Sequence, residues 1–262
     1  MSDRIIVRNE GRVRILVNNN PTARNAISAD FYTALPEALA EAQADASVGA
    51  IVLTGAEGFF SAGGDLRQLA TRRELPEAER RARLEGLHDM IRAIRDCGKP
   101  VIAAVEGGAA GAGVSLAMAC DLLVMARGAY FSVAYVKVGL TPDGGATAFL
   151  SQVLPRQLLV EMCLTGDKVG AERLASLGAV NRLVDAGSAE NEAITLAARL
   201  AQGPAQAMRR IKHLCHHAYD ADVEAQLELE AWHMVTSLGG AESAEGIGAF
   251  LQKRPANFAG MQ

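Results

Sequence analysis

Asp143 is the acidic residue whose surroundings most favour a chemical role. It stands in the sequence Thr-Pro-Asp-Gly-Gly at positions 141–145, a tight loop that opens a predicted helix. A carboxylate in such a loop can face a substrate held between packed elements, and burial would raise its pKa for acid–base work. An Asp that precedes a helix is equally an ordinary N-cap. The spacing alone supports both interpretations.

A small-residue loop at positions 107–113 is the strongest local motif. Glycines let the backbone approach a ligand closely, and free N–H groups at a helix N-terminus favour negative charge. The glycine order is G-x-x-G-x-G, and no acidic residue follows about 20 positions later, so a dinucleotide site is disfavoured. Tight packing of a helix on a strand would also explain these glycines.

Ser115 lies in Gly-Val-Ser-Leu-Ala, close to the G-x-S-x-G pattern of a nucleophile elbow. An elbow places its serine directly after a strand, whereas Ser115 falls inside a helix predicted over 114–119. We therefore expect a buried or capping serine.

Three histidines, His213, His216 and His217, share one side of a predicted helix. No carboxylate motif of the H-E-x-x-H kind accompanies them, so we expect a solvated helix face and no metal site.

The charged residues between 65 and 85 have structural explanations. Asp65 is expected to cap a helix, because Gly63 and Gly64 already supply the turn before it. Positions 72–83 mix Arg with Glu, which predicts a solvated helix or a mobile lid. Positions 66–83 are also expected to form part of a pocket wall.

The elements that must position these residues alternate between strands and helices. Apolar runs predict strands at 5–8, 13–18, 49–54, 100–105, 122–126 and 180–184. Helices are predicted from Ser28 to about Ala44, up to about Cys97, over 114–119, and over most of the chain after Ala146. This order indicates an α/β fold with a helical C-terminal third.

Composition limits the class of protein. The chain has 262 residues, 50% of them hydrophobic and 21% charged, which predicts one or two ordered domains. The net charge of −4 and an aromatic content of 5% argue against a nucleic-acid partner.

Four scattered cysteines, with no C-x-x-C pair, predict reduced thiols in a cytoplasmic protein. The N-terminus has charges where a signal peptide needs an apolar core, and no uncharged stretch reaches membrane-spanning length. We therefore expect neither a membrane anchor nor a membrane partner.

Five segments in order resemble the crotonase family, the enoyl-CoA hydratase/isomerase superfamily. They are Asn-Pro-Thr-Ala-Arg-Asn-Ala at 20–26, Phe-Ser-Ala-Gly-Gly-Asp-Leu at 60–66, Ala-Gly-Ala-Gly-Val-Ser-Leu-Ala-Met-Ala-Cys-Asp at 110–121, Val-Gly-Leu-Thr-Pro-Asp-Gly-Gly at 138–145 and Glu-Gly-Ile-Gly-Ala-Phe-Leu-Gln-Lys-Arg at 245–254. The resemblance implies a spiral of ββα units at 1–200 and a helical oligomerisation region at 201–262. It also implies a homotrimer, or a hexamer formed as a dimer of trimers.

The resemblance implies an acyl-CoA thioester substrate and no metal or separate cofactor, since coenzyme A enters with the substrate. The backbone N–H groups of Gly64 and Ala112 would form an oxyanion hole for the thioester oxygen. In similar acyl-transfer sites each such donor is worth about 3–4 kcal/mol. Many family members have Gly at the position of Ala112, but the N–H survives that change.

The resemblance also assigns substrate-binding residues. Arg24, Arg67, Phe250 and Lys253 correspond to positions that contact CoA in relatives, the last two reaching a neighbouring subunit's CoA. The full set assigned to substrate binding is Ala23, Arg24, Ala62, Gly63, Asp65, Leu66, Arg67, Ala110, Tyr135, Pro142, Phe250 and Lys253.

This chain departs from the family's hydratases at the catalytic carboxylates. Ser115 and Tyr135 occupy the positions of the two hydratase glutamates, and Asp143 remains. The combined motifs look most like the 1,2-epoxyphenylacetyl-CoA isomerase branch, in which this aspartate is the proposed acid–base residue.

Four functions follow from the resemblance. The leading one is an acyl-CoA isomerase in which Asp143 moves a proton. An enoyl-CoA hydratase is second, because fold does not fix the reaction. A third is 4-chlorobenzoyl-CoA dehalogenase-like chemistry with Asp143 and His88, although Tyr135 and Gly64 replace aromatic residues there. The fourth is a CoA-thioester binder without catalysis.

Overall fold

A six-stranded sheet forms the centre of the computed structural model, which describes residues 4–261. The strand order is β1-β2-β3-β4-β6-β9, and every neighbouring pair is parallel except β1 and β2. The strands are β1 (Ile5–Glu10), β2 (Val13–Asn18), β3 (Ala50–Gly55), β4 (Val101–Val105), β6 (Leu122–Ala126) and β9 (Arg182–Val184).

A second, three-stranded sheet has the order β5-β7-β8. Its strands are β5 (Ala109–Ala110), β7 (Tyr130–Ser132) and β8 (Lys168–Gly170). β5 lies within the glycine-rich segment 107–113, for which the sequence predicted a loop and no strand. Pairing with β7 gives this segment a fixed backbone path.

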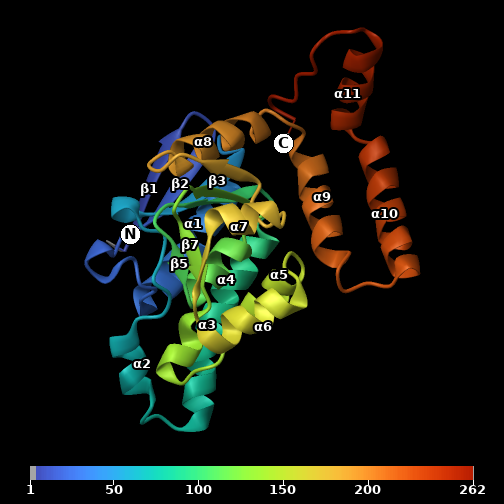
Figure 1. Ribbon diagram of the computed structural model, residues 1–262. Helices are drawn as coiled ribbons and strands as arrows, with labels where there is room; N and C mark the ends of the chain where they lie inside the picture. The colour runs from blue at the N-terminus through green and yellow to red at the C-terminus, as the bar shows by residue number, and fades with distance from the viewer. Residues whose placement is uncertain (1–3, 262) are drawn as a thin grey trace.

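Eight α-helices accompany the two sheets within residues 4–200, as labelled in Figure 1. α8 packs on β3, β4 and β6, while α1 packs on α3, β1 and β2. Because helices cover the central strands, β4 is buried at every position and reads as a continuous apolar run. The helices are α1 (Ala29–Ala44), α2 (Leu66–Arg72), α3 (Glu77–Asp96), α4 (Ala112–Met118), α5 (Ala146–Ser151), α6 (Arg156–Thr165), α7 (Ala171–Ser176) and α8 (Ala189–Leu200).

Three short 3-10 turns join these elements: η1 (Pro21–Ala23), η2 (Ala56–Gly58) and η3 (Ala134–Val138). Ser28 caps α1 as predicted, since its side chain accepts a hydrogen bond from the Phe31 N–H. The charged segment 72–83 is not one element, because α2 ends at Arg72 and α3 begins at Glu77. The predicted strand at 180–184 is shorter than expected and begins at Arg182.

Three C-terminal helices project away from the sheets in Figure 1. They are α9 (Ala205–His217), α10 (Val223–Leu238) and α11 (Ala241–Leu251). A domain boundary at 200/201 stays a prediction, although α8 does end at Leu200. Among the described residues, no helix is long and apolar enough to cross a membrane.

Candidate active site

Two loops that follow neighbouring parallel strands lie side by side. One follows β3 and η2, and the other follows β4. The Ser61 N–H donates to the Gly108 oxygen at 3.3 Å, and the Ala110 N–H donates to the Ser61 oxygen at 2.9 Å. Carboxyl ends of parallel strands are where ligands bind in open α/β sheets. These bonds therefore hold Gly63 and its neighbours against the start of α4.

Gly63 is the point of closest approach between the two loops. Its φ is +85°, and a Cβ added there would lie 2.4 Å from the Ala110 oxygen and 3.0 Å from the Ala112 nitrogen. Only glycine tolerates both the left-handed backbone and this contact. The sequence assigned Gly63 and Ala110 to the site, and the structure brings them together.

The N–H groups of Gly64 and Ala112 have no hydrogen-bond acceptor among residues 4–261. Gly64 forms a bridge with Ile27, but the bonds of that bridge use the Gly63 oxygen and the Asp65 N–H. Ala112 is the first residue of α4, where an N–H has no partner within the helix. Two such donors on adjacent loops can stabilise negative charge on a bound oxygen.

Asp143 forms a hydrogen-bonded pair with Tyr135. The Tyr135 hydroxyl donates to Oδ1 of Asp143 at 2.7 Å, and Tyr135 is 8% exposed. Gly145, and not Asp143, is the N-cap of α5, and the Asp143 side chain makes no capping bond. The capping alternative for Asp143 is therefore wrong, and the carboxyl is free to face a ligand.

Ser115 positions the Asp143 loop. Its hydroxyl donates to the backbone oxygen of Asp143 at 2.9 Å, and the residue is fully buried. A Cβ on Gly144 would lie 3.0 Å from the Ser115 Cβ, so the loop packs directly on α4. The prediction of a buried serine is confirmed.

Burial raises the pKa of Asp143 above its usual value. The Tyr135 hydrogen bond and the charges of His88 and Arg72 oppose that shift without cancelling it. The pKa of Tyr135 is raised far above its usual range, because burial and the nearby Asp143 carboxylate disfavour a phenolate. At neutral pH Tyr135 thus remains a donor, and Asp143 can take up or release a proton more readily than an exposed Asp.

Tyr32 and Arg72 also lie near Asp143, and sequence reasoning did not assign either to the site. Arg72 lies in the predicted wall segment 66–83, whereas no motif drew attention to Tyr32 in α1. The carboxylate of Asp143 raises the pKa of Tyr32, although burial is the larger cause. Which side chains of a helix face inward depends on what the helix packs against, so the sequence alone did not point to Tyr32.

Ala23 and Arg24, two of the residues predicted to bind CoA, lie beside the loop that carries Gly63. Ala23 ends η1, and Arg24 follows it with a φ of +48°. The Arg24 guanidinium lies 5.8 Å from the centre of the Phe59 ring, and the Arg24 oxygen accepts from the Ala62 N–H at 2.8 Å. This arrangement places a cation beside the Gly63 loop.

The start of α2 supplies three further predicted residues. Asp65 caps the helix by accepting a bond from the Arg67 N–H at 2.9 Å, as the sequence predicts. Leu66 is 57% exposed, and Arg67 is exposed beside it. Pro142, another residue assigned to substrate binding, directly precedes Asp143 and is half-buried.

Phe250 and Lys253 do not join this site within one chain. Phe250 is in α11 and Lys253 follows it, and Figure 1 shows α11 on the opposite side of the molecule from α2. Phe250 is 82% exposed. A contact between these residues and CoA requires another copy of the chain.

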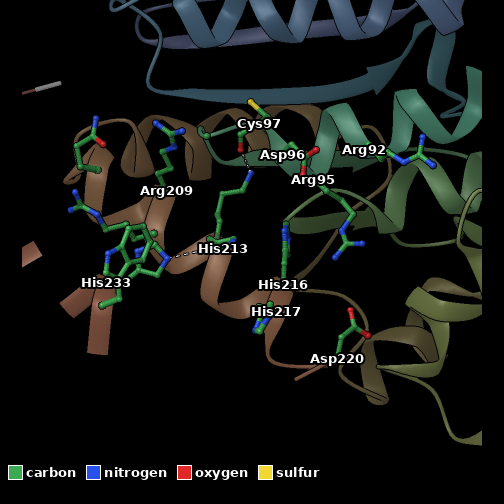
Figure 2. A pocket seen from close by; sticks show the side chains of 15 residues that line it. Arg92, Arg95, Asp96, Cys97, Arg209, His213, His216, His217, Asp220 and His233 are labelled. Atoms are coloured by element: carbon green, nitrogen blue, oxygen red, sulfur yellow. Dashed lines mark hydrogen bonds between the residues drawn. The ribbon is translucent and has the colours of Figure 1, made fainter. Parts of the chain in front are cut away.

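The histidines of α9 lie largely on a solvated face, as the sequence predicts: His213 and His217 are exposed, and His216 is half-buried. His213 and His233 share a hydrogen bond of 2.8 Å (Figure 2). His216 lies 3.4 Å from Asp121. These histidines line a groove of about 640 Å³ between the end of α3, α9 and α10, which Gly64, Ala112 and Asp143 do not line. The described residues contain no cluster of three or more metal-ligating side chains.

Comparisons with known proteins identify relatives over almost the whole chain. A family model described as enoyl-CoA hydratase/isomerase matches residues 9–261. A probable enoyl-CoA hydratase of Rhodobacter capsulatus is 37% identical over 94% of this chain and 94% of its own. The 1,2-epoxyphenylacetyl-CoA isomerase of Escherichia coli K12 is 32% identical over 99% of this chain and 100% of its own. A crystal structure of an enoyl-CoA hydratase from Polaromonas sp. JS666 has 42% identity and a TM-score of 0.93, and the match covers 97% of this chain and 98% of that one.

The fold and these relatives define an acyl-CoA enzyme with the crotonase fold. The chain belongs to the enoyl-CoA hydratase/isomerase family of the crotonase superfamily. The resemblance found in the sequence is thereby confirmed for family and for fold class.

Proposed function

We propose that this protein is an acyl-CoA isomerase that shifts a proton with Asp143. One observation carries the proposal: the half-buried Asp143 carboxyl accepts a hydrogen bond from Tyr135, and a Cβ on Gly111, the residue before the Ala112 donor, would lie 3.8 Å from the Tyr135 ring. The N–H groups of Gly64 and Ala112 have no acceptor among the described residues. A raised pKa suits a group that must first accept a proton and then return it.

The reaction begins when the Asp143 carboxylate removes a proton from a carbon activated by the thioester or by an adjacent double bond. The electron pair delocalises onto the thioester oxygen, and the N–H groups of Gly64 and Ala112 donate to that oxygen. Asp143, now protonated, delivers the proton to another carbon of the conjugated system. The double bond moves, the atoms of the substrate are conserved, and Asp143 returns to its starting state.

Ser115 and Tyr135 support an isomerase over a hydratase. Hydration needs carboxylates that orient and deprotonate water, and these two positions hold a buried hydroxyl and a phenol. A hydratase is nevertheless the second candidate, because relatives such as the Rhodobacter capsulatus protein carry that name. Dehalogenase-like chemistry is third, favoured by the charge of His88 acting on Asp143.

Coenzyme A is expected to bind along Arg24 and Arg67, with no separate cofactor or metal. Phe250 and Lys253 would reach CoA in another subunit of a homotrimer or of a hexamer. Exposed apolar side chains on α10 and α11 support such an assembly. Four free cysteines support a cytoplasmic location.

Mass spectrometry of a 3-enoyl-CoA incubated in D₂O tests the reaction. Wild type should convert it to the 2-enoyl isomer with deuterium uptake, and Asp143→Asn should be slower by about 10²–10⁴-fold. Asp89→Asn is the matched control, because Asp89 is a solvent-exposed carboxylate that pairs with Arg92 on α3. Its rate should equal that of wild type.

Other outcomes separate the alternatives. Addition of water to a 2-enoyl-CoA, lost in Asp143→Asn, would replace the isomerase by the hydratase. Chloride release from 4-chlorobenzoyl-CoA would support the dehalogenase. Tight binding of CoA esters with no exchange in wild type would leave a binding protein.

A further inference from the structure

Arg72 is a half-buried cation in the last turn of α2, close to the proposed catalytic carboxyl. Its guanidinium carbon lies 5.8 Å from the centre of the Tyr32 ring on α1. Arg72 also forms a side-chain hydrogen bond with Tyr32. A guanidinium has five N–H donors, so others are available to an acceptor in its plane.

Arg72 forms no ion pair with a carboxylate of residues 4–261. Two acidic residues of α3 are engaged elsewhere: Glu85 pairs with Arg81, His88 and Arg92, and Asp89 pairs with Arg92. Asp143 is near enough for the charge of Arg72 to lower its pKa, but it bonds to Tyr135 instead. A half-buried guanidinium without a counter-ion favours an anionic ligand.

The position of Arg72 and Tyr32 fits the far end of a bound acyl group. A Cβ on Gly86 of α3 would lie 3.9 Å from the Tyr32 side chain, and the adjacent Leu87 would contact a Cβ on Gly144 at 3.3 Å. Packing through one turn of α3 therefore connects Tyr32 to the Asp143 loop. Leu69 of α2 would contact a Cβ on Gly64 at 3.2 Å, and Arg72 follows three residues later on the same side of α2.

We propose that Arg72 and Tyr32 bind a carboxylate at the far end of the acyl chain, so that the substrates are CoA thioesters of dicarboxylic acids. The inference rests on the proposed function for the place of the thioester. Arg72 supplies paired N–H donors that match a carboxylate, and the Tyr32 hydroxyl supplies a further donor. Burial raises the pKa of Tyr32, which keeps that hydroxyl protonated.

Binding of saturated thioesters tests this specificity without any turnover. Calorimetry would compare three pairs of equal chain length: glutaryl-CoA with pentanoyl-CoA, adipoyl-CoA with hexanoyl-CoA, and suberoyl-CoA with octanoyl-CoA. Wild type should bind the dicarboxylic member of at least one pair about 10- to 100-fold more tightly, the range for a hydrogen-bonded charge.

Arg72→Gln should remove this preference and leave the affinity for the neutral member of the pair unchanged. Arg72→Lys, which keeps the charge but loses the paired geometry, should retain part of the preference, and Tyr32→Phe should weaken it. Arg73→Gln is the matched control, since Arg73 is the next residue and is exposed. It should behave as wild type.

Two results would overturn the inference. One is a wild-type affinity for the neutral thioester that equals or exceeds the affinity for the dicarboxylic thioester in all three pairs. The other is an Arg72→Gln variant whose affinities for the neutral and the dicarboxylic thioester change by the same factor. That result would mean that Arg72 acts only through Asp143 or the fold. If the preference is found but no deuterium exchange occurs with any enoyl-CoA, the inference stands and the isomerase proposal fails.

Discussion

At the scale of single residues, Asp143 combines burial with one strong hydrogen-bond donor. Burial alone would hold the carboxyl neutral, and a fully hydrogen-bonded carboxylate would be too weak a base. The Tyr135 hydroxyl, 2.7 Å away, stabilises the ionised form, while burial stabilises the protonated form. Both forms are thereby accessible during one proton transfer.

Changing Tyr135 to Phe should move the acidic limb of the pH–rate profile. The base must be ionised, so the rate falls as the pH drops through the raised pKa of Asp143. Loss of the hydroxyl removes a bond that lowers this pKa, so the limb should shift to higher pH in Tyr135→Phe. Deuterium uptake measured between about pH 4 and 9 reports the shift.

Tyr219→Phe is the control for this prediction, because Tyr219 is 62% exposed and distant from the Asp143 loop in sequence. Its profile should match that of wild type. A limb that stays in place or moves to lower pH in Tyr135→Phe would show that the hydroxyl does not set the pKa of Asp143.

At the scale of elements, the site depends on two loops whose backbones touch. The parallel pairing of β3 with β4 brings their carboxyl ends together, and Gly63 permits the contact with Ala110. The contact itself joins backbone atoms of the two loops, and the Ser61 hydroxyl supports it by accepting a hydrogen bond from the Gly63 N–H at 3.2 Å. The spacing of the two proposed oxyanion donors is therefore a property of the backbone.

Gly63→Ala tests that dependence, with Gly58→Ala as the matched control. Both glycines have positive φ, +85° and +73°, but a Cβ on Gly58 meets nothing within 4 Å. Gly63→Ala should be less stable than Gly58→Ala by about 1–3 kcal/mol because of the clash with Ala110. It should also lose about 10²–10³-fold in turnover, as expected when an oxyanion donor is displaced.

Chemical denaturation and turnover of the same two variants give both quantities. Equal stability and equal activity of Gly63→Ala and Gly58→Ala would mean that the loops can move apart at no cost. The backbone contact would then not fix the site.

The sequence predicted the elements of this site better than their interactions. Apolar runs without alternation predicted the buried strands, and the glycines predicted close backbone approach. The pairing of Tyr135 with Asp143 was not predictable, because Tyr135 lies in η3 and its hydroxyl reaches a carboxyl 8 residues later, beyond any helical or strand spacing. Tyr32 and Arg72 were missed since each lies on a helix whose inward face depends on its packing partner.

At the scale of the whole molecule, α10 and α11 expose apolar side chains that the rest of the described chain does not cover. They include Trp232, Met234, Val235, Leu238, Phe250 and Leu251, and Val235 is 72% exposed. Exposed apolar surface of this kind marks an interaction site in soluble proteins. It agrees with the proposed assembly of three or six chains.

Sedimentation velocity of wild type should therefore give a mass of three or six times 27.6 kDa. Met234→Asp combined with Val235→Asp should shift the protein toward monomer, since each buried apolar side chain contributes about 1.5–3 kcal/mol. Glu228→Gln, an exposed change on the same helix, is the control. A monomeric wild type would contradict the assembly.

The limits of prediction at this scale have a physical origin. Helical periodicity located the C-terminal helices and the solvated face of α9, on which His213 and His217 are exposed, but it did not predict the hydrogen bond to α10. In the structure α10 packs beside α9, and His233, 20 residues further along, bonds to His213. A pattern within one helix cannot reveal a partner that arrives from another.

The two donors assigned to the thioester oxygen belong to peptide groups, and among single substitutions only a change to proline removes such an N–H. Heritable variation at positions 115, 135 and 143 acts on side chains alone. An ancestor of this chain could therefore exchange one acyl-CoA reaction for another while every intermediate generation still stabilised the same charged oxygen. Diversification of the chemistry then requires few substitutions and passes through no inactive scaffold.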